Sequence, residues 1–229
     1  MKKVRIRKHP KINNIFISGA LERPKLYTKN LVKGKRIYGE KLYHENEIEY
    51  REWNPYRSKL AAIILKNPSI KFLKNNQNCL YLGAASGTTI SHLSDILTDG
   101  VIYALEFAER SIRQLIQNTS ERMNIIPILG DARFPLNYAK SVFTNIDIIY
   151  QDVAQPNQAE IAIRNSNYYL KEEGILILAI KSQSIDSVSK SEIIYKQEKK
   201  VLQQAGLLIL ESLNIQKYAA NHIVIIAKK

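Results

Sequence analysis

The sequence of 229 residues holds one cysteine, Cys79, and no hydrophobic run long enough to cross a membrane. A single cysteine excludes an internal disulfide and a zinc site built from several cysteines, so we interpret Cys79 as a small core residue. Near the start, Arg5, Arg7 and Lys8 interrupt the apolar core that a secretory signal requires, and we expect no such signal. These absences favour a reducing, cytoplasmic setting without a membrane partner.

Acidic residues are scarce relative to basic ones. The chain has 34 Lys and Arg residues against 21 Asp and Glu residues, which gives a net charge of +13 and a pI near 9.7. Excess positive charge attracts polyanions, because it neutralises phosphates and releases counterions, so nucleic acid is the expected partner. A biased genome composition or a hot habitat would produce the same lysine excess without any ligand.

The first 54 residues differ in pattern from the rest. Short runs with interleaved polar residues occur at 4–7 and 15–18, glycine and proline separate them, and no long helical period is present. Such a pattern predicts short strands joined by turns. We expect a small antiparallel β module over residues 1–54 and a second domain over 55–229. Four tyrosines would pack this module, or would contact RNA beside the neighbouring lysines: Tyr27, Tyr38, Tyr43 and Tyr50.

A helix is predicted directly after this module. Asn54 and Pro55 precede the apolar stretch 60–65, and an asparagine before a proline is typical of a helix start. We therefore predict a helix that begins at Asn54. Lys59 lies within it, and its local surroundings suit an ordinary solvated lysine.

The clearest local signal is an apolar run that stops in small residues. Residues 78–82 are typical of a buried parallel strand, and Gly83 and Gly87 allow a tight turn after it. A helical pattern follows, which Thr88 or Thr89 could cap. A strand, a glycine turn and a helix in this order can bind a nucleotide-like cofactor, although the same residues also suit a simple turn.

Glu106 supports the cofactor interpretation. It ends the next apolar run and lies about 20 positions after Gly87, where a carboxylate can accept hydrogen bonds from ribose hydroxyls. Gly83 and Gly87 lie four apart without a third glycine, which departs from the dinucleotide fingerprint for pyrophosphate. The combination indicates S-adenosylmethionine rather than NAD.

Helical and apolar segments alternate through the rest of the chain. The predicted helices cover 109–122 and 156–170, and the predicted strands cover 125–129, 146–150 and 175–180. This alternation implies parallel strands joined by helices, with ligands at the carboxyl ends of the strands. Polar residues follow those ends: Asp131, which could accept from an adenine amino group, then Asp152 and Lys181. His222 precedes the last apolar run.

Four blocks of sequence resemble fibrillarin in its short archaeal form, from about Tyr38 to the C-terminus. The glycine loop is common to many methyltransferases, whereas the block from Asp152 is highly specific. The blocks are Leu82-Gly83-Ala84-Ala85-Ser86-Gly87-Thr88-Thr89, Gly130-Asp131-Ala132-Arg133, Asp152-Val153-Ala154-Gln155-Pro156-Asn157-Gln158-Ala159 and Ile180-Lys181-Ser182-Gln183-Ser184-Ile185-Asp186. The resemblance implies an α/β fold: a Rossmann-like S-adenosylmethionine methyltransferase sheet, mostly parallel with an antiparallel last strand, beside the small β module.

The resemblance also implies a function. Fibrillarins are S-adenosylmethionine-dependent 2′-O-methyltransferases that act on rRNA and, in archaea, also on tRNA. They work as the catalytic subunit of a box C/D guide ribonucleoprotein, in which the guide RNA selects the target by base pairing. The expected protein partners are a Nop-type scaffold protein and a kink-turn-binding ribosomal-type protein, in the cytoplasm of an archaeal cell.

The site residues follow from the same resemblance, and no metal is expected. The implied catalytic set is Lys59, Asp152, Lys181 and His222. The implied cofactor residues are Gly83, Ala84, Thr88, Thr89, Glu106, Phe107, Asp131, Ala132, Asp152 and Gln155. Relatives usually carry an acidic residue before this histidine, whereas this chain has Asn221.

These residue types suit methyl transfer to a ribose hydroxyl, which needs in-line placement and help with removal of a proton. We expect Lys181 to contact the 2′-hydroxyl and accept or relay its proton, Asp152 to hold this lysine, and His222 to complete the network. Two alternatives stay open: a stand-alone RNA methyltransferase that selects its own target, and a non-catalytic subunit whose cofactor only stabilises the fold.

Overall fold

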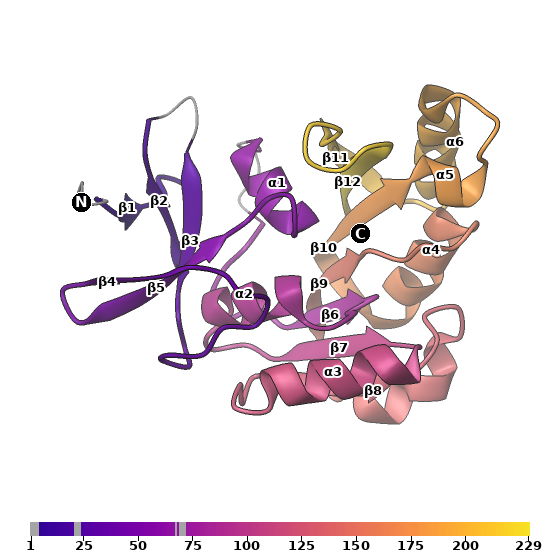
Figure 1. Ribbon diagram of the computed structural model, residues 1–229. Helices are drawn as coiled ribbons and strands as arrows, with labels where there is room; N and C mark the ends of the chain where they lie inside the picture. Colours follow the sequence, from indigo (N-terminus) through magenta and orange to yellow (C-terminus); the bar gives the residue numbers. More distant parts are fainter. Residues whose placement is uncertain (1–4, 21–23, 67, 69–71) are drawn as a thin grey trace.

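The computed structural model describes residues 5–20, 24–66, 68 and 72–229, and it contains two sheets (Figure 1). The first sheet is antiparallel, with strand order β1-β2-β3-β5-β4. Its strands are β1 (Arg7–Lys8), β2 (Ile15–Ser18), β3 (Lys25–Lys29), β4 (Leu42–Glu45) and β5 (Ile48–Trp53). The predicted strand 15–18 is therefore confirmed, whereas Val4 of the predicted run 4–7 lies outside the described residues.

The second sheet has seven strands in the order β11-β12-β10-β9-β6-β7-β8. Strands β6 to β10 pair in parallel, and β12 pairs antiparallel with β10 and with β11. The predicted fold class, a mostly parallel sheet with an antiparallel last strand beside a small antiparallel module, is confirmed. The strands are β6 (Cys79–Leu82), β7 (Ile102–Glu106), β8 (Ile125–Leu129), β9 (Ile146–Gln151), β10 (Leu170–Lys181), β11 (Leu208–Asn214) and β12 (His222–Lys228).

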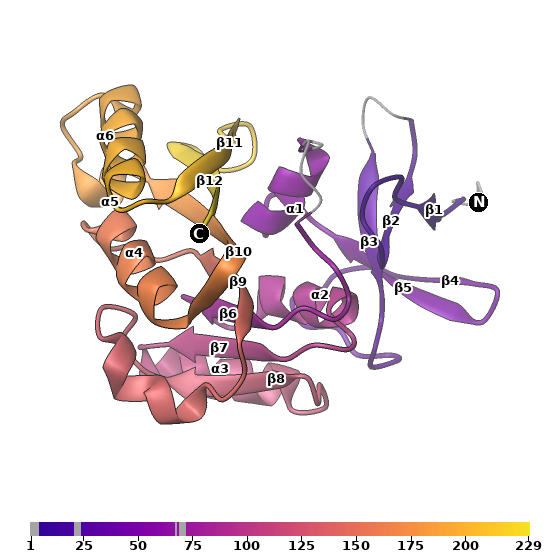
Figure 2. The same cartoon turned by 180° about the vertical axis from the view of Figure 1, so that it is seen from behind.

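Helices cover both faces of the large sheet (Figures 1 and 2). Alternate strand residues point to opposite faces: Tyr81 and Tyr150 pack with α1, α2 and α3, whereas Leu80 and Ile149 pack with η1, α4 and α6. Both faces are therefore buried, which explains the continuous apolar runs. The helices are α1 (Lys59–Leu65), α2 (Thr88–Ile96), α3 (Glu109–Thr119), η1 (Pro135–Ser141), α4 (Gln158–Tyr169), α5 (Ser182–Ile185) and α6 (Ser191–Gln204).

The small sheet shares a hydrophobic core with the large one. Ile15, Leu26 and Trp53 of the small sheet belong to the same buried cluster as the apolar residues of α1 and α2. The small sheet ends at Trp53, but the shared core joins it to the rest of the chain. The division into residues 1–54 and 55–229 stays a prediction.

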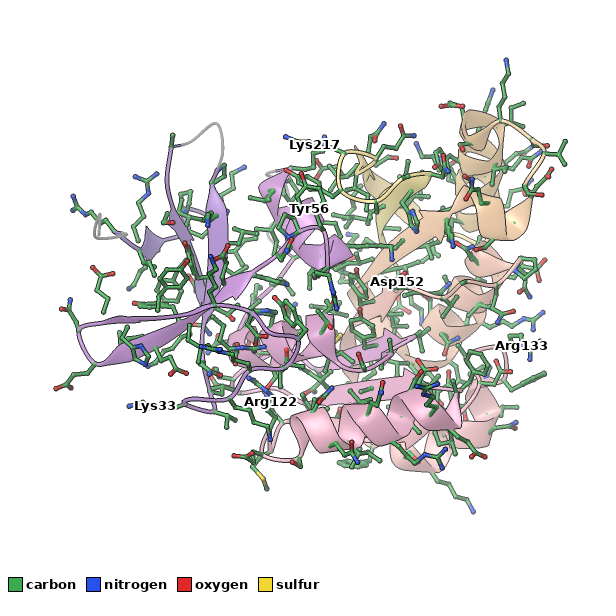
Figure 3. The ribbon with its side chains drawn as sticks, viewed as in Figure 1. Lys33, Tyr56, Arg122, Arg133, Asp152 and Lys217 are labelled. Carbon is green, nitrogen blue, oxygen red and sulfur yellow. The ribbon has the colours of Figure 1, made fainter. Side chains whose placement is uncertain are left out.

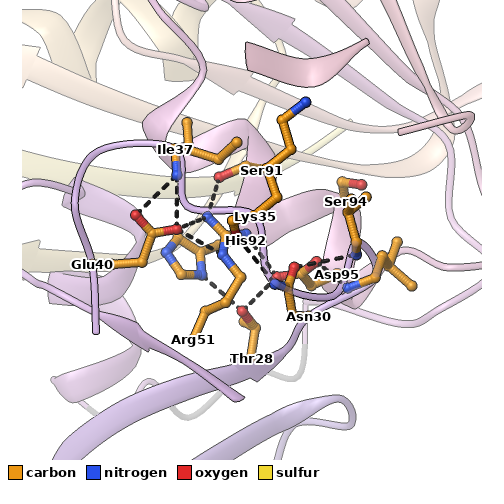
Figure 4. Close-up of polar contacts among 12 residues, drawn as sticks. Thr28, Asn30, Lys35, Ile37, Glu40, Arg51, Ser91, His92, Ser94 and Asp95 are labelled. Carbon is orange, nitrogen blue, oxygen red and sulfur yellow. Dashed lines mark hydrogen bonds and ion pairs between the residues drawn. The ribbon is translucent and has the colours of Figure 1, made fainter. Parts of the chain in front are cut away.

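A buried polar network also fastens the two sheets together (Figure 4). Asp95 of α2 pairs with Arg51 of β5, with 2.9 Å between Oδ2 and Nη1, and with Arg122, with 2.6 Å between Oδ1 and Nη1. Thr28 of β3 donates a hydrogen bond to Asp95 Oδ2 at 2.7 Å, and Glu40 accepts from Arg51 at 2.6 Å. These side chains are almost completely buried, so the network fixes the small sheet against α2.

The predicted helix start at Asn54 is wrong. Helix α1 begins at Lys59, with Ser58 as the N-cap residue, whose Oγ accepts a hydrogen bond from the Ala61 amide at 3.4 Å. Asn54 Oδ1 instead accepts from the Tyr56 amide at 2.9 Å, which makes a local turn. An asparagine side chain satisfies a turn and a helix start equally well, so the sequence pattern could not separate them.

Other helix ends also differ from the predicted ones. Gly87 is the N-cap residue of α2, in the left-handed region with φ 95°, and neither Thr88 nor Thr89 caps the helix. Helix α3 ends at Thr119 rather than at residue 122, and α4 begins at Gln158 rather than at residue 156. Every helix in the part of the chain that the structure describes is too short or too polar to cross a bilayer.

Candidate active site

A cavity of about 230 Å³ lies at the carboxyl ends of β6, β7, β8 and β9. The strand order reverses between β6 and β9, which is where open α/β sheets bind their ligands. The predicted cofactor residues that line it are Gly83, Glu106, Phe107, Asp131, Ala132, Asp152 and Gln155. The others that line it, which sequence reasoning missed, are Ala85, Leu105, Gly130, Val153, Ala154 and Ile161.

Gly83 lets two strand ends approach closely beside the cavity. Its φ is 88°, and a Cβ atom there would lie 2.4 Å from the carbonyl oxygen of Asp152. The Asp152 amide donates to the carbonyl oxygen of Leu82 at 2.9 Å, so the end of β9 is held directly against the turn. A side chain at position 83 would push Asp152 away from this place.

Glu106 presents a nearly buried carboxylate at the cavity, with 7% of its surface exposed. Its Oε2 accepts from the Ala85 amide at 2.8 Å, and its Oε1 accepts from the Ala108 amide at 2.9 Å. Each carboxylate oxygen has a second lone pair, so both can also accept from ribose hydroxyls. These acceptor oxygens therefore fit the ribose hydroxyls of S-adenosylmethionine.

Asp131, just after β8, supplies a second acceptor in the lining of the cavity. Its carboxylate accepts from the Arg133 guanidinium, with 2.6 Å between Oδ2 and Nη2, and from the Arg133 amide at 2.9 Å. Hydrogen bonds from the Arg133 side chain lower the pKa of Asp131, which keeps it charged at neutral pH. A charged acceptor fits an adenine amino group.

Three predicted cofactor residues lie outside the lining of this cavity. Ala84 is buried, and its amide donates to the carbonyl oxygen of Leu105 at 3.0 Å. Thr88 starts α2, and Thr89 Oγ1 donates to Ser58 Oγ at 3.0 Å. Ala85, rather than Ala84, faces the cavity because its φ of 49° turns the chain there. Two adjacent alanines carry no sequence signal that separates these roles.

Lys59 and Asp152 form the first half of the predicted catalytic set. Lys59 Nζ lies 2.8 Å from Asp152 Oδ2, and about a quarter of each side chain is exposed. The lysine is the first residue of α1, and the aspartate follows β9. The ion pair of the Asp152 carboxylate joins it to Lys59, and the expectation that Asp152 holds Lys181 stays a prediction.

Lys181 and His222 form the second half. Lys181 ends β10, His222 begins β12, and the two are directly opposite in the antiparallel register. Opposite residues of an antiparallel pair carry their side chains on the same face, about 5 Å apart. Gln158 fixes the lysine backbone: its Oε1 accepts from the Lys181 amide at 3.0 Å, and its Nε2 donates to the Lys181 carbonyl at 3.2 Å.

His222 is held in one tautomer. Its Nδ1 lies 2.6 Å from the carbonyl oxygen of Ala220, which can only accept, so Nδ1 carries the proton and Nε2 keeps its lone pair. Burial lowers the pKa of His222, Lys59 and Lys181 lower it further, and the Ala220 hydrogen bond and Asp152 oppose this shift. The histidine therefore lies within electrostatic reach of the other three members of the set.

Asn221 occupies a backbone conformation that suits asparagine. Its φ is 58°, in the left-handed region that Asn and Asp tolerate better than most residues. Its carbonyl oxygen accepts from the Ser182 amide at 3.1 Å, so the residue links the end of β10 to the start of β12. The described residues contain no group of three or more His, Cys, Asp and Glu side chains placed to bind a metal.

A parallel sheet with a glycine turn after β6, a buried acid at the end of β7 and a cavity at the switch point defines an S-adenosylmethionine-dependent methyltransferase of the Rossmann-like class. The turn after β6 carries two glycines, Gly83 and Gly87, and lacks the third glycine of a pyrophosphate-binding turn. The sequence profile of the family described as Fibrillarin matches residues 6–229, and the chain belongs to this family.

Relatives and solved structures agree with this assignment. The chain is 50% identical over 210 residues to "Fibrillarin-like rRNA/tRNA 2'-O-methyltransferase" of Methanosarcina barkeri, covering 90% of this chain and 92% of that one. Aeropyrum pernix fibrillarin, solved with natively bound S-adenosyl-L-methionine, is 42% identical with a TM-score of 0.90, covering 99% and 100% of the two chains. A chain of a fibrillarin/Nop5p complex is 42% identical with a TM-score of 0.82, covering 90% and 94%.

Proposed function

We propose that this chain transfers a methyl group from S-adenosylmethionine to ribose 2′-hydroxyls of rRNA and tRNA, as the catalytic subunit of a box C/D guide ribonucleoprotein. The observation that carries the proposal is the double role of Asp152. Its side chain pairs with Lys59 of the predicted catalytic set, and the same residue lines the cavity that fits the cofactor. Methyl donor and catalytic groups would therefore meet at one residue.

The residues proposed to bind the cofactor have different chemical roles. Glu106 would accept from the ribose hydroxyls and Asp131 from the adenine amino group, while Ala132 and Ile161 supply apolar lining between polar groups. When bound, S-adenosylmethionine supplies an electrophilic methyl group on a sulfonium. Gly83 keeps the strand ends close enough for Asp152 to remain at the cavity.

The catalytic residues would act on the ribose hydroxyl. Lys181 contacts this hydroxyl and accepts or relays its proton, and the positive charge of Lys59 stabilises negative charge that develops on the oxygen. Asp152 holds Lys59 in place through the 2.8 Å ion pair. His222 would complete the network through Nε2, which keeps its lone pair because Nδ1 donates to the Ala220 carbonyl oxygen.

The proposed partners supply target selection. The net charge of +13 suits an RNA-bound particle, and the similar chain solved with Nop5p supports a Nop-type scaffold protein. We propose in addition a box C/D guide RNA, a kink-turn-binding ribosomal-type protein, and the cytoplasm of an archaeal cell, in line with the source of the relatives.

The test is transfer of labelled methyl groups to a target RNA, with and without a matching guide RNA and the two partner proteins. Methylation at the guided ribose only in the complete mixture supports the proposal. Equal transfer without the guide would identify a stand-alone enzyme. No transfer despite cofactor binding would identify a non-catalytic subunit.

One variant pair sharpens this test. Lys181→Ala should abolish transfer and leave the affinity for S-adenosylmethionine nearly unchanged, because this side chain is outside the cavity lining. Lys200→Ala, an exposed lysine on α6, is the matched control and should remain active. Full activity of Lys181→Ala would remove this lysine from the mechanism.

A further inference from the structure

One buried glutamine contacts both parts of the proposed active site. Gln158 is the first residue of α4, and 0% of its surface is exposed. Its side chain hydrogen-bonds to Gln155, which lines the cofactor cavity, and to Lys181, which ends β10. Gln158 itself lies outside the cavity lining. The sequence block from Asp152 includes it, but neither the catalytic set nor the cofactor set does.

The carboxamide of Gln158 is held in one orientation. Its Oε1 accepts from the Lys181 amide at 3.0 Å, and its Nε2 donates to the carbonyl oxygens of Lys181 at 3.2 Å and Gln155 at 2.9 Å. A backbone N–H can only donate and a carbonyl oxygen can only accept, so one orientation satisfies all of these partners. Rotation of the carboxamide by half a turn would break every one of these bonds.

These bonds take the place of a neighbouring strand. The described pairing of β10 with β9 ends at Leu178 and Gln151, before Lys181 is reached. The backbone of Lys181 is extended, with φ −101° and ψ 101°, so its N–H and C=O point to the same side, towards the side chain of Gln158. The carboxamide pairs with both groups as a strand residue would, and it keeps the peptide groups of Lys181 from turning.

The same arrangement sets how Lys181 faces His222. On the other side of β10, the Ser182 amide donates to the Asn221 carbonyl oxygen at 3.1 Å. Lys181 and His222 are opposite in register, and they therefore form a non-hydrogen-bonded pair. The Cα atoms of such a pair are about 4.5 Å apart, against about 5.5 Å in a hydrogen-bonded pair. The two side chains thus start from the closer of the two spacings in an antiparallel sheet.

Gln158 is in turn anchored to the end of β9. The side chain of Gln151, which is also completely buried, donates from Nε2 to the carbonyl oxygen of Gln158 at 2.7 Å. Gln151 ends β9 directly before Asp152, which Figure 3 shows near the middle of the molecule. A continuous chain of hydrogen bonds therefore joins the end of β9, through Gln158, to Lys181 and to the cavity lining.

We propose that Gln158 is a positioning residue for methyl transfer, because it holds Lys181 in a fixed place relative to the loop 152–155 that lines the cofactor cavity. The inference rests on the proposed function, which puts Lys181 at the target hydroxyl and S-adenosylmethionine in the cavity. Gln158 acts through the backbone of Lys181 and touches no reacting atom. A displacement of about 1 Å at such a site can lower a rate about 100-fold.

The test is a single round of guided methylation. Particles are assembled from the chain, the guide RNA, the two partner proteins and an equal molar amount of target RNA, and saturating labelled S-adenosylmethionine starts the reaction. Gln158→Glu keeps the side-chain volume and an acceptor for the Lys181 amide. Even a protonated carboxyl has one hydrogen, however, and two carbonyl oxygens each need one. We expect the rate constant to fall about 100-fold, while the final amount of methylated RNA stays the same.

Two further variants support this comparison. Gln203→Glu makes the same change at an exposed position of α6, and it should keep the full rate constant. Gln158→Asn introduces no charge, but its side chain is one methylene shorter and cannot reach all of the partners. It should show the same fall in rate constant, and the Lys181 amide should exchange its hydrogen faster by NMR than in the unchanged chain.

The outcomes separate a positioning role from a merely structural one. Partial unfolding of the Gln158 variants would lower the final amount of methylated RNA at an unchanged rate constant, and this result would overturn the proposal. A rate constant that recovers at higher S-adenosylmethionine concentration would also overturn it, because Gln158 would then affect cofactor affinity alone. No guided methylation by the unchanged chain would overturn the proposed function, whereas equal rate constants for all chains would overturn the role of Gln158 and leave that function standing.

Discussion

Replacing Asp95 with asparagine removes a buried negative charge that two arginines share. In the folded chain, Arg51 and Arg122 each donate to Asp95, at 2.9 and 2.6 Å, and all three side chains are at most 1% exposed. After Asp95→Asn, Arg51 still has Glu40 as a charged partner at 2.6 Å. Among the described residues, the side chain of Arg122 keeps two neutral acceptors, Asn30 at 3.1 Å and Ser94 at 3.2 Å.

The expected loss of stability comes from Arg122, which would have no charged partner left, whereas Arg51 would keep Glu40. Removing one partner of a buried ion pair leaves an uncompensated charge, which costs about 3–5 kcal/mol of unfolding free energy. Asparagine has nearly the volume of aspartate, so no cavity adds to this cost. At roughly 2–4 °C per kcal/mol for a chain of this size, the melting temperature should fall by about 10 °C.

Urea and thermal unfolding of Asp95→Asn beside the unchanged chain would measure the loss of unfolding free energy and the fall in melting temperature. Asp99→Asn is the matched control, because Asp99 lies just beyond α2 and is exposed, and a surface change of this kind costs about 0.5 kcal/mol or less. A loss for Asp95→Asn that is no larger than the control's would show that the network does not hold the small sheet against α2.

Three further predictions concern the site. Glu106→Gln should weaken S-adenosylmethionine binding roughly 10-fold by calorimetry, the worth of a hydrogen bond to a charged group, and unchanged affinity would exclude its ribose contact. Gly83→Ala should lose cofactor binding, because its Cβ would lie 2.4 Å from the Asp152 carbonyl oxygen, and full binding would contradict this. His222 should titrate by NMR below its ordinary pKa of 6.5, because burial disfavours the charged ring, and a pKa at or above that value would contradict this. Lys59→Met should raise the pKa of His222 and Asp152→Asn should lower it, and shifts of opposite sign would contradict the charge arrangement.

Local chemistry in the sequence was enough to predict most strands of the large sheet, although β11 (Leu208–Asn214) was missed. The strand at 125–129 has the predicted bounds, and the runs at 146–150 and 175–180 lie within β9 and β10. Glu106 and Gly83 were found because a buried strand and the turn after it each leave a pattern within a few residues. The element ends were less accurate, since Asn54 and Thr88 can serve a turn or a cap with the same atoms.

The predicted catalytic set shows what the sequence could not determine. Lys59 has the local surroundings of a solvated lysine, and only the resemblance to fibrillarins singled it out in the sequence. Its partner Asp152 is 93 positions away, and the pairing depends on where α1 packs against the end of β9. Likewise, the register of β10 and β12, not any spacing in the chain, puts Lys181 opposite His222.

The sequence by itself therefore determined the fold class, the glycine turn and the acid at the end of β7 that is predicted to bind ribose, because hydrophobic periods and turn residues act over short stretches of chain. Only the tertiary structure decided that Asp152 pairs with Lys59, that Ala85 rather than Ala84 lines the cavity, and that Gln158 holds the backbone of Lys181. Contacts between distant residues depend on strand order, register and packing, and these are properties of the whole folded chain.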